Sequence, residues 1–127
     1  PVLYNESSKL RGGAHEDINL ITLLVGAEES GLEVKSKKGT WVPIKASSNA
    51  IVCNIGDMMQ LVTDGLLLST THRVISYPES QSKSRYSMPF FLHPSPNIIL
   101  KSIFDETDEG VLADDFLTER LRAIKLY

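Results

Sequence analysis

Turn-forming residues recur at short intervals along this 127-residue chain, and they leave room only for short elements between them. Short apolar or alternating runs lie near residues 2–4, 17–25, 32–35, 41–44, 50–55, 67–76, 84–92 and 97–102. The turn signals between them are Gly12-Gly13, Ser30-Gly31, Lys38-Gly39, Gly56-Asp57, Asp64-Gly65, Tyr77-Pro78 and the Pro94/Pro96 pair. Several short strands with frequent turns predict an all-β sandwich or barrel. The Asp64-Gly65 pair, between MMQLV and LLLST, predicts a tight hairpin.

The last segment, ADDFLTERLRAIKLY, follows a different period. Leu117, Leu121 and Ile124 are spaced i, i+4 and i+7, which places them on one face of a helix. Acidic residues come early in the segment and basic residues come late, as the helix dipole favours. We expect a C-terminal helix packed on the outside of the sheets.

Composition narrows the classes of function. The hydrophobic content of 42% and charged content of 23% are typical of one soluble globular domain. The net charge of -3 comes without a basic stripe, so we expect no nucleic-acid partner, and the lack of a long apolar run predicts no membrane partner. The single cysteine, Cys53, lies in the apolar run AIVCNI and predicts a buried thiol, a reducing compartment and a cytoplasmic location. Nothing in the sequence specifies an oligomeric state.

The segment AHEDINLITLLV contains two residue types that bind metals. His15 and Asp17 are two residues apart, and on a strand such residues point to the same face. His72, at the end of the predicted strand LLLSTTHRVI, is the candidate third ligand. Two imidazoles and one carboxylate leave three positions open on an octahedral ion, a set that suits non-haem Fe(II). Taken alone, the same residues also fit ordinary core or surface positions.

A second pair lies in SRYSMPFF, where Arg85 and Ser87 are also two residues apart. On a strand they share a face, and a guanidinium beside a hydroxyl is a good receptor for a carboxylate. The alternative for Arg85 alone is an ordinary surface cation.

Several longer motifs join these residues into one pattern. HEDINLITLLV resembles HTDxxxLTLL, and SGLEV followed by GTWVPI resembles PGLQV…GxWVxV. IVCNIGDMMQLVTDGLLLSTTHRV resembles VxNxGDxxQxxTNGxxxSTxHRV, and SRYSMPFFLHPSP resembles xRxSxPFFxxPxP. In this order the motifs resemble those of the Fe(II)/2-oxoglutarate-dependent oxygenases, and the isopenicillin N synthase-like group most of all. The resemblance extends from about Tyr4 to the C-terminal helix.

The resemblance implies a double-stranded β-helix, or jelly roll, with a C-terminal helix. It assigns the Fe(II) ligands to His15, Asp17 and His72, and the distal carboxylate of the cosubstrate 2-oxoglutarate to Arg85 and Ser87. Tyr4 resembles the tyrosine of the group's YP strand, which often adds a hydrogen bond to the cosubstrate, although Asn5 replaces the proline here. Members of the group carry a large N-terminal region that this sequence lacks, and Pro1 reads as the middle of a strand. We therefore expect residues 1–127 to be one oxygenase core domain, the C-terminal part of a longer chain.

The implied activity is an O2-dependent oxidation of a small organic substrate by hydroxylation, desaturation or cyclisation, with release of succinate and CO2. Three alternatives stay open. One is an oxidase of the same group that does not consume 2-oxoglutarate, as isopenicillin N synthase and aminocyclopropane carboxylate oxidase do not. Another is a non-catalytic jelly-roll binding domain with a vestigial metal site. A zinc hydrolase is the third, although the pattern offers it no obvious general base.

Overall fold

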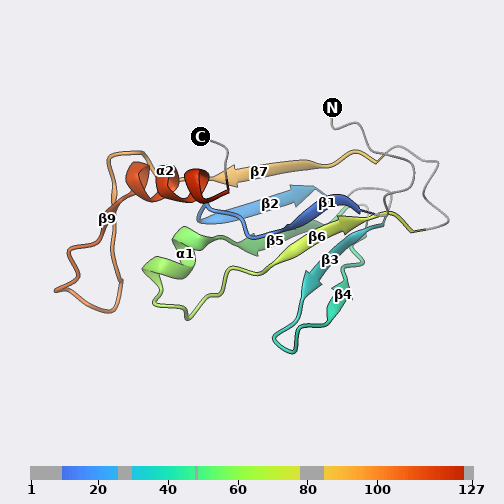
Figure 1. Cartoon of the computed structure of the whole chain (residues 1–127), viewed down its shortest axis with the longest axis horizontal. Coiled ribbons are helices and arrows are strands. Elements are labelled where there is room, and N and C mark those ends of the chain that lie inside the picture. Colours follow the sequence, from blue (N-terminus) through green and yellow to red (C-terminus); the bar gives the residue numbers. More distant parts are fainter. Residues whose placement is uncertain (1–9, 26–29, 48, 78–84, 125–127) are drawn as a thin grey trace. The chain divides into compact units, whose positions relative to one another are not determined.

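A computed structural model describes residues 10–25, 30–47, 49–77 and 85–124 of the chain (Figure 1). Tyr4 and the strand predicted near residues 2–4 lie outside the described residues. The chain forms two compact units. The first contains Pro1–Glu16, Leu24–Val52 and Thr70–Pro89, and the second contains Asp17–Leu23, Cys53–Ser69 and Phe90–Tyr127.

An antiparallel four-stranded sheet with the order β1-β6-β3-β4 forms the first unit. Its strands are β1 (Leu10–His15), β6 (His72–Ile75), β3 (Leu32–Lys35) and β4 (Trp41–Pro43). The sequence predicted β3 and β4 closely. Strand β6 is shorter than predicted, because His72 begins it instead of ending it, and β1 was not predicted at all.

The glycine pair Gly12-Gly13 lies inside β1, although it predicted a turn. The pairing of β1 with β6 runs Leu10↔Ile75, Gly12↔Val74 and His15↔His72, with a register shift in each interval. At each shift β1 carries one residue more than its partner, which is the pattern of a β-bulge, and glycine is common at such positions. The glycines therefore mark irregular pairing within a strand.

A further sheet has the order β5-β2-β7, with strands β5 (Ile51–Ile55), β2 (Ile21–Val25) and β7 (Met88–Leu92). Strand β5 agrees with the prediction, whereas β2 and β7 begin later than predicted. Residues 17–20 do not extend β2, because their carbonyl groups accept hydrogen bonds from the start of helix α1 (Asp57–Val62). The expected placement of His15 and Asp17 on one continuous strand is therefore wrong.

Helix α1 replaces the predicted hairpin around Asp64-Gly65. Its residue Met58 is 1% exposed, and Val62, four residues later, packs against the same apolar cluster, which is helical spacing. Asp64 and Gly65 both have positive φ, 49° and 77°, and the N–H of Gly65 bonds to the carbonyl of Gln60. A left-handed Asp-Gly pair is typical of a hairpin turn and also ends a helix, and here it ends α1.

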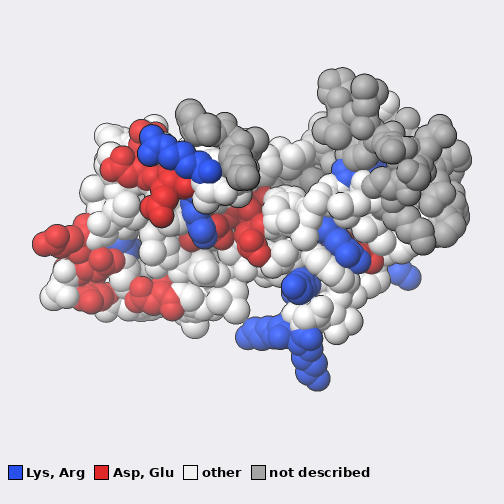
Figure 2. Space-filling model, in the orientation of Figure 1, with Lys and Arg blue, Asp and Glu red and all other residues white. Residues whose placement is uncertain are grey.

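The remaining elements of the second unit are β8 (Ile99–Leu100), β9 (Val111–Leu112) and α2 (Ala113–Ala123), the predicted C-terminal helix. Its buried core consists of Met58, Leu100 and Ala113, and Phe116 and Leu117 of α2 pack against it. The buried face of α2 therefore begins one turn earlier than predicted, and Ile124 is 58% exposed. Figure 2 shows acidic side chains gathered over the β8–β9 loop and α2.

The sequence predicted a buried Cys53 thiol and no membrane partner. Cys53 is exposed on β5, so the predicted buried thiol is wrong: strand alternation turns its side chain outward, between the less exposed Val52 and Asn54. Among the described residues, no helix combines the length and apolar character needed to cross a bilayer.

Candidate metal centre

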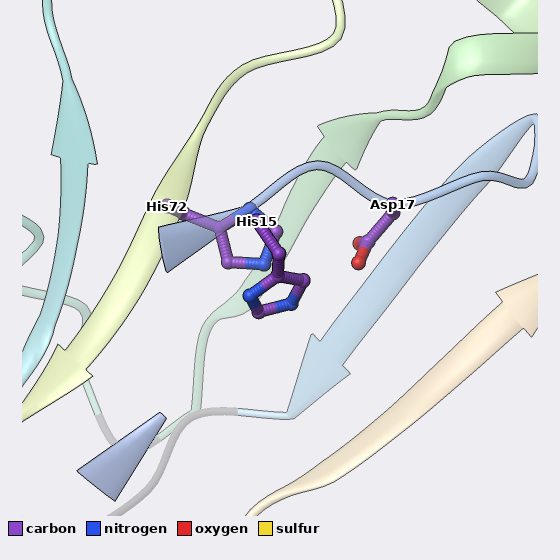
Figure 3. Close-up of side chains that lie close together, drawn as sticks. All are labelled: His15, Asp17 and His72. Atoms are coloured by element: carbon purple, nitrogen blue, oxygen red, sulfur yellow. The ribbon is translucent and has the colours of Figure 1, made fainter. Parts of the chain in front are cut away.

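The three predicted metal ligands lie close together (Figure 3). His15 and His72 are directly opposite each other in the β1–β6 ladder, and their ring centroids are 4.3 Å apart. Asp17 follows His15 by two residues, so the covalent chain itself keeps it near. One ligand atom from each of the three residues lies within 4.8 Å of the other two, a span that small side-chain rotations close around one divalent ion.

Both histidines are oriented by the same local contact. Nδ1 of His15 is 2.7 Å from the carbonyl oxygen of Gly13, and Nδ1 of His72 is 3.1 Å from that of Thr70. A carbonyl oxygen only accepts hydrogen bonds, so Nδ1 carries the proton in each ring. In the neutral imidazole the lone pair is then on Nε2, which is the atom that binds a metal when Nδ1 donates to a backbone carbonyl.

Asp17 is held in a different way, by polar side chains around a buried carboxylate that is 7% exposed. Its Oδ2 accepts hydrogen bonds from Thr22 Oγ1 at 2.5 Å and from Asn54 Nδ2 at 2.8 Å. Thr22 Oγ1 in turn accepts a bond from Asn19 Nδ2 at 2.9 Å. Donors of this kind fix the orientation of a carboxylate that could bind a metal.

The backbone that carries Asp17 is held by the first turn of α1. The N–H of Asp57 donates to the carbonyl of Asp17 at 2.8 Å, and the N–H of Met58 donates to the carbonyl of Ile18 at 3.1 Å. The preceding residue, Gly56, lies so close to Asn19 that an added Cβ would be 2.1 Å from its carbonyl oxygen. A side chain at Gly56 would push the segment away, so glycine is required here by the close approach of two backbones.

The strand that carries His72 has supports of its own. The next residue, Arg73, forms an ion pair with the buried Glu33 of β3 at 2.7 Å, and its guanidinium lies 4.1 Å from the centroid of the Trp41 ring. Thr71 donates a hydrogen bond to the carboxylate of Glu16. The first two contacts join β6 to β3 and β4, and the third joins the residue before β6 to the residue after β1.

The predicted cosubstrate residues are placed only in part. Arg85 Nη1 donates to Ser87 Oγ at 3.4 Å, so the guanidinium and hydroxyl do lie side by side. Both residues precede β7, which begins at Met88, so the expectation that a strand aligns them is wrong. Tyr4 lies outside the described residues, and its predicted role stays a prediction.

Sequence reasoning missed the residues that hold Asp17. Asn54 was not singled out, and Gly56-Asp57 was interpreted only as a turn signal. A signal was present, because Asn54 is a polar residue within the apolar strand IVCNI, and buried polar groups need partners. Thr22 gave a similar signal in ITLLV.

Comparison with known proteins agrees with this geometry. Residues 2–94 match the model of the 2OG-Fe(II) oxygenase superfamily. The chain is 32% identical over 111 residues to feruloyl CoA ortho-hydroxylase 2 of Arabidopsis thaliana. The match covers 87% of this chain and 30% of the Arabidopsis protein. It is 41% identical over 99 residues to 1-aminocyclopropane-1-carboxylate oxidase of Dictyostelium mucoroides, covering 77% and 26%.

Among solved structures, a full-length protein of Neurospora crassa in complex with alpha-KG superposes with a TM-score of 0.79 at 30% identity. The match covers 91% of this chain and 38% of the Neurospora protein. This chain thus spans about a third of the length of the proteins it matches. With the antiparallel sheets and the C-terminal helix, the superposition confirms the predicted all-β double-stranded β-helix. The chain belongs to the 2OG-Fe(II) oxygenase superfamily.

Proposed function

We propose that this chain is the catalytic core of an Fe(II)- and 2-oxoglutarate-dependent oxygenase that oxidises a small organic substrate. The observation that carries the proposal is the grouping of His15, Asp17 and His72, with both imidazoles oriented to offer Nε2. The donor set fits the metal, because two neutral imidazoles and one carboxylate bind Fe(II) and leave three positions open. When bound, the iron and its cosubstrate supply the oxidising chemistry, with O2 consumed and succinate and CO2 released.

The protein's own residues bind and orient. Asn54 and Thr22 hold the Asp17 carboxylate in place, and the strand ladder keeps the two imidazoles opposite each other. Arg85 and Ser87 form the proposed receptor for the distal carboxylate of 2-oxoglutarate. Their mutual contact supports this role, since the guanidinium fork and the hydroxyl lie close enough together to bind one carboxylate.

A test of both assignments starts with the anaerobic addition of Fe(II) and 2-oxoglutarate, which should give the weak visible absorption of a chelate. Arg85→Ala should weaken 2-oxoglutarate binding roughly 10- to 100-fold, because a hydrogen bond to a charged group contributes about 1.5–3 kcal/mol. The matched control is Arg122→Ala, an exposed arginine of α2, which should bind the cosubstrate like the parent. Equal binding by Arg85→Ala and the parent would exclude the carboxylate assignment.

A second candidate function is an oxidase of the same group that does not consume 2-oxoglutarate. The 41% identity to a 1-aminocyclopropane-1-carboxylate oxidase favours it. The two candidates differ in products: the oxygenase forms one succinate for each 2-oxoglutarate that it decarboxylates. Succinate formed in step with substrate oxidation would select the oxygenase, and substrate oxidation by O2 and Fe(II) without succinate would select the oxidase.

A further inference from the structure

Asp57 connects the C-terminal helix to the segment that carries Asp17. Its carboxylate is buried, with 9% of the side chain exposed, and Oδ2 lies 2.6 Å from Arg120 Nη2. The guanidinium of Arg120 lies over the ring of Phe116, 5.6 Å from its centroid, and Phe116 packs against the buried apolar cluster. Arg120 is therefore braced within α2 while it neutralises a buried charge on α1.

The backbone of Asp57 makes the second half of the connection. The same residue that pairs with Arg120 donates its N–H to the carbonyl of Asp17 at 2.8 Å. The adjacent N–H groups of Gly56 and Met58 bond to Leu20 at 3.0 Å and to Ile18 at 3.1 Å. A shift of Asp57 therefore displaces the whole segment that presents Asp17.

We infer that Arg120 is a positioning residue for the metal ligand Asp17, acting through Asp57. The inference rests on the proposed function of the site. Without Arg120, the buried Asp57 carboxylate loses its cation, which is unfavourable unless the group moves toward water. That movement changes the first turn of α1, and the Asp17 carbonyl follows because it is bonded to that turn. Residues that orient metal ligands from the outer shell typically change affinity 10- to 100-fold, and Arg120 is one contact further out.

The experiment measures Co(II) binding to the full chain by its visible absorption, below the melting temperature of every variant. Arg120→Gln should weaken Co(II) binding by about 3- to 10-fold. Arg120→Lys should restore part of the loss because it keeps the charge. Arg122→Gln is the matched control, since it makes the same charge change two residues along on an exposed part of α2. It should bind Co(II) like the parent.

Two further variants separate positioning from stability. Val111→Ala removes part of a side chain that packs on the same apolar cluster and should lower the melting temperature without changing Co(II) affinity. Asp57→Asn keeps the N–H and removes the charge, so adding Arg120→Gln to it should cause no further loss. A full additional loss in that background would overturn the inference, because Arg120 would then act by another route.

The outcomes also distinguish the inference from the proposed function. If the parent chain bound no Co(II), both the proposed function and the inference about Arg120 would be contradicted. If the parent and Arg120→Gln bound Co(II) equally tightly, only the inference about Arg120 would be contradicted. Equal losses in Arg120→Gln and in either Arg122→Gln or Val111→Ala would also overturn it, because net charge or stability would then explain the effect.

Discussion

The histidines and the aspartate of the candidate centre are supported in contrasting ways. Each imidazole bonds to the carbonyl of the residue two positions before it, and strand pairing sets the two rings opposite each other. The carboxylate is buried, and it depends on Thr22 and on the distant Asn54. The histidine side is thus built from local contacts and one ladder, whereas the carboxylate side depends on a long-range network. We expect the aspartate to couple metal binding to folding more strongly than the histidines do.

The largest effect is expected when one proposed ligand is removed from each side of the centre. Asp17→Ala and His15→Ala should each weaken Fe(II) or Co(II) binding by two orders of magnitude or more, since each ligand of a metal site contributes about 3 kcal/mol. Without metal the two variants should differ. Asp17→Ala leaves buried donors unpaired and should lower the free energy of unfolding by about 1–3 kcal/mol, whereas the exposed His15 should contribute less than about 0.5 kcal/mol. Calorimetric titration and urea unfolding of the apo chains measure both quantities, and equal stability losses would contradict the contrast.

A pair of glycine substitutions probes the backbone on each side. Gly56→Ala should lower the free energy of unfolding by about 1–3 kcal/mol and weaken metal binding, because the new Cβ would collide with the backbone and side chain of Asn19. Gly13→Ala is the matched control on the histidine side, where an added Cβ would meet nothing within 4 Å. It should change stability by no more than about 0.5 kcal/mol. Denaturant unfolding decides the comparison, and a neutral Gly56→Ala would show that the segment has room to move.

Single hydrogen-bond deletions give a smaller effect in the same direction. Asn54→Ala removes a side-chain donor to Asp17 Oδ2, and it should lower stability by about 1 kcal/mol and weaken Co(II) binding about tenfold. On the histidine side, Thr71→Val removes the exposed hydrogen bond to Glu16 and should change both quantities little. Spectroscopic Co(II) titration of the two variants beside the parent provides the measurement. If Thr71→Val had the larger effect, the ladder would not be sufficient to hold the histidines.

The same contrast separates what the sequence predicted from what it did not. Strands β3, β4 and β5 were predicted because alternation and flanking turns are local signals, and the three candidate ligands were singled out because they lie within a recognisable motif. Helix α1 was missed because its six-residue segment, DMMQLV, is too short for its apolar residues to distinguish a helix from a strand. The placement of Asp17 beyond the end of β1 was missed because residues 17–20 find their partners almost forty residues away, on α1. Long-range hydrogen bonds of this kind leave no periodic trace in the sequence.

The smallest effect is expected at Asp108, a carboxylate whose hydrogen-bond partners are close to it in the sequence. It can be compared directly with Asp17, whose partner Asn54 is distant. Asp108, in the β8–β9 loop, accepts hydrogen bonds from the N–H groups of Ser102 at 2.7 Å and Gly110 at 2.9 Å. These bonds, Ser102 first, hold the pKa of Asp108 below its ordinary value of 3.8. A folded-state pKa that is lowered stabilises the fold above the unfolded pKa, and this contribution is lost as the pH falls through the folded value.

Asp108→Asn should therefore lower the melting temperature slightly at pH 7, and the difference from the parent should shrink as the pH falls below 3.8. Co(II) affinity at pH 7 should not change, because Asp108 has no part in the network around Asp17. Asp108 is half-buried, and its contribution should be small because water still reaches its charge in the folded chain. Thermal unfolding across pH, together with one Co(II) titration, measures both. A change in Co(II) affinity as large as that of Asn54→Ala would mean that burial and side-chain donors are not what distinguishes Asp17.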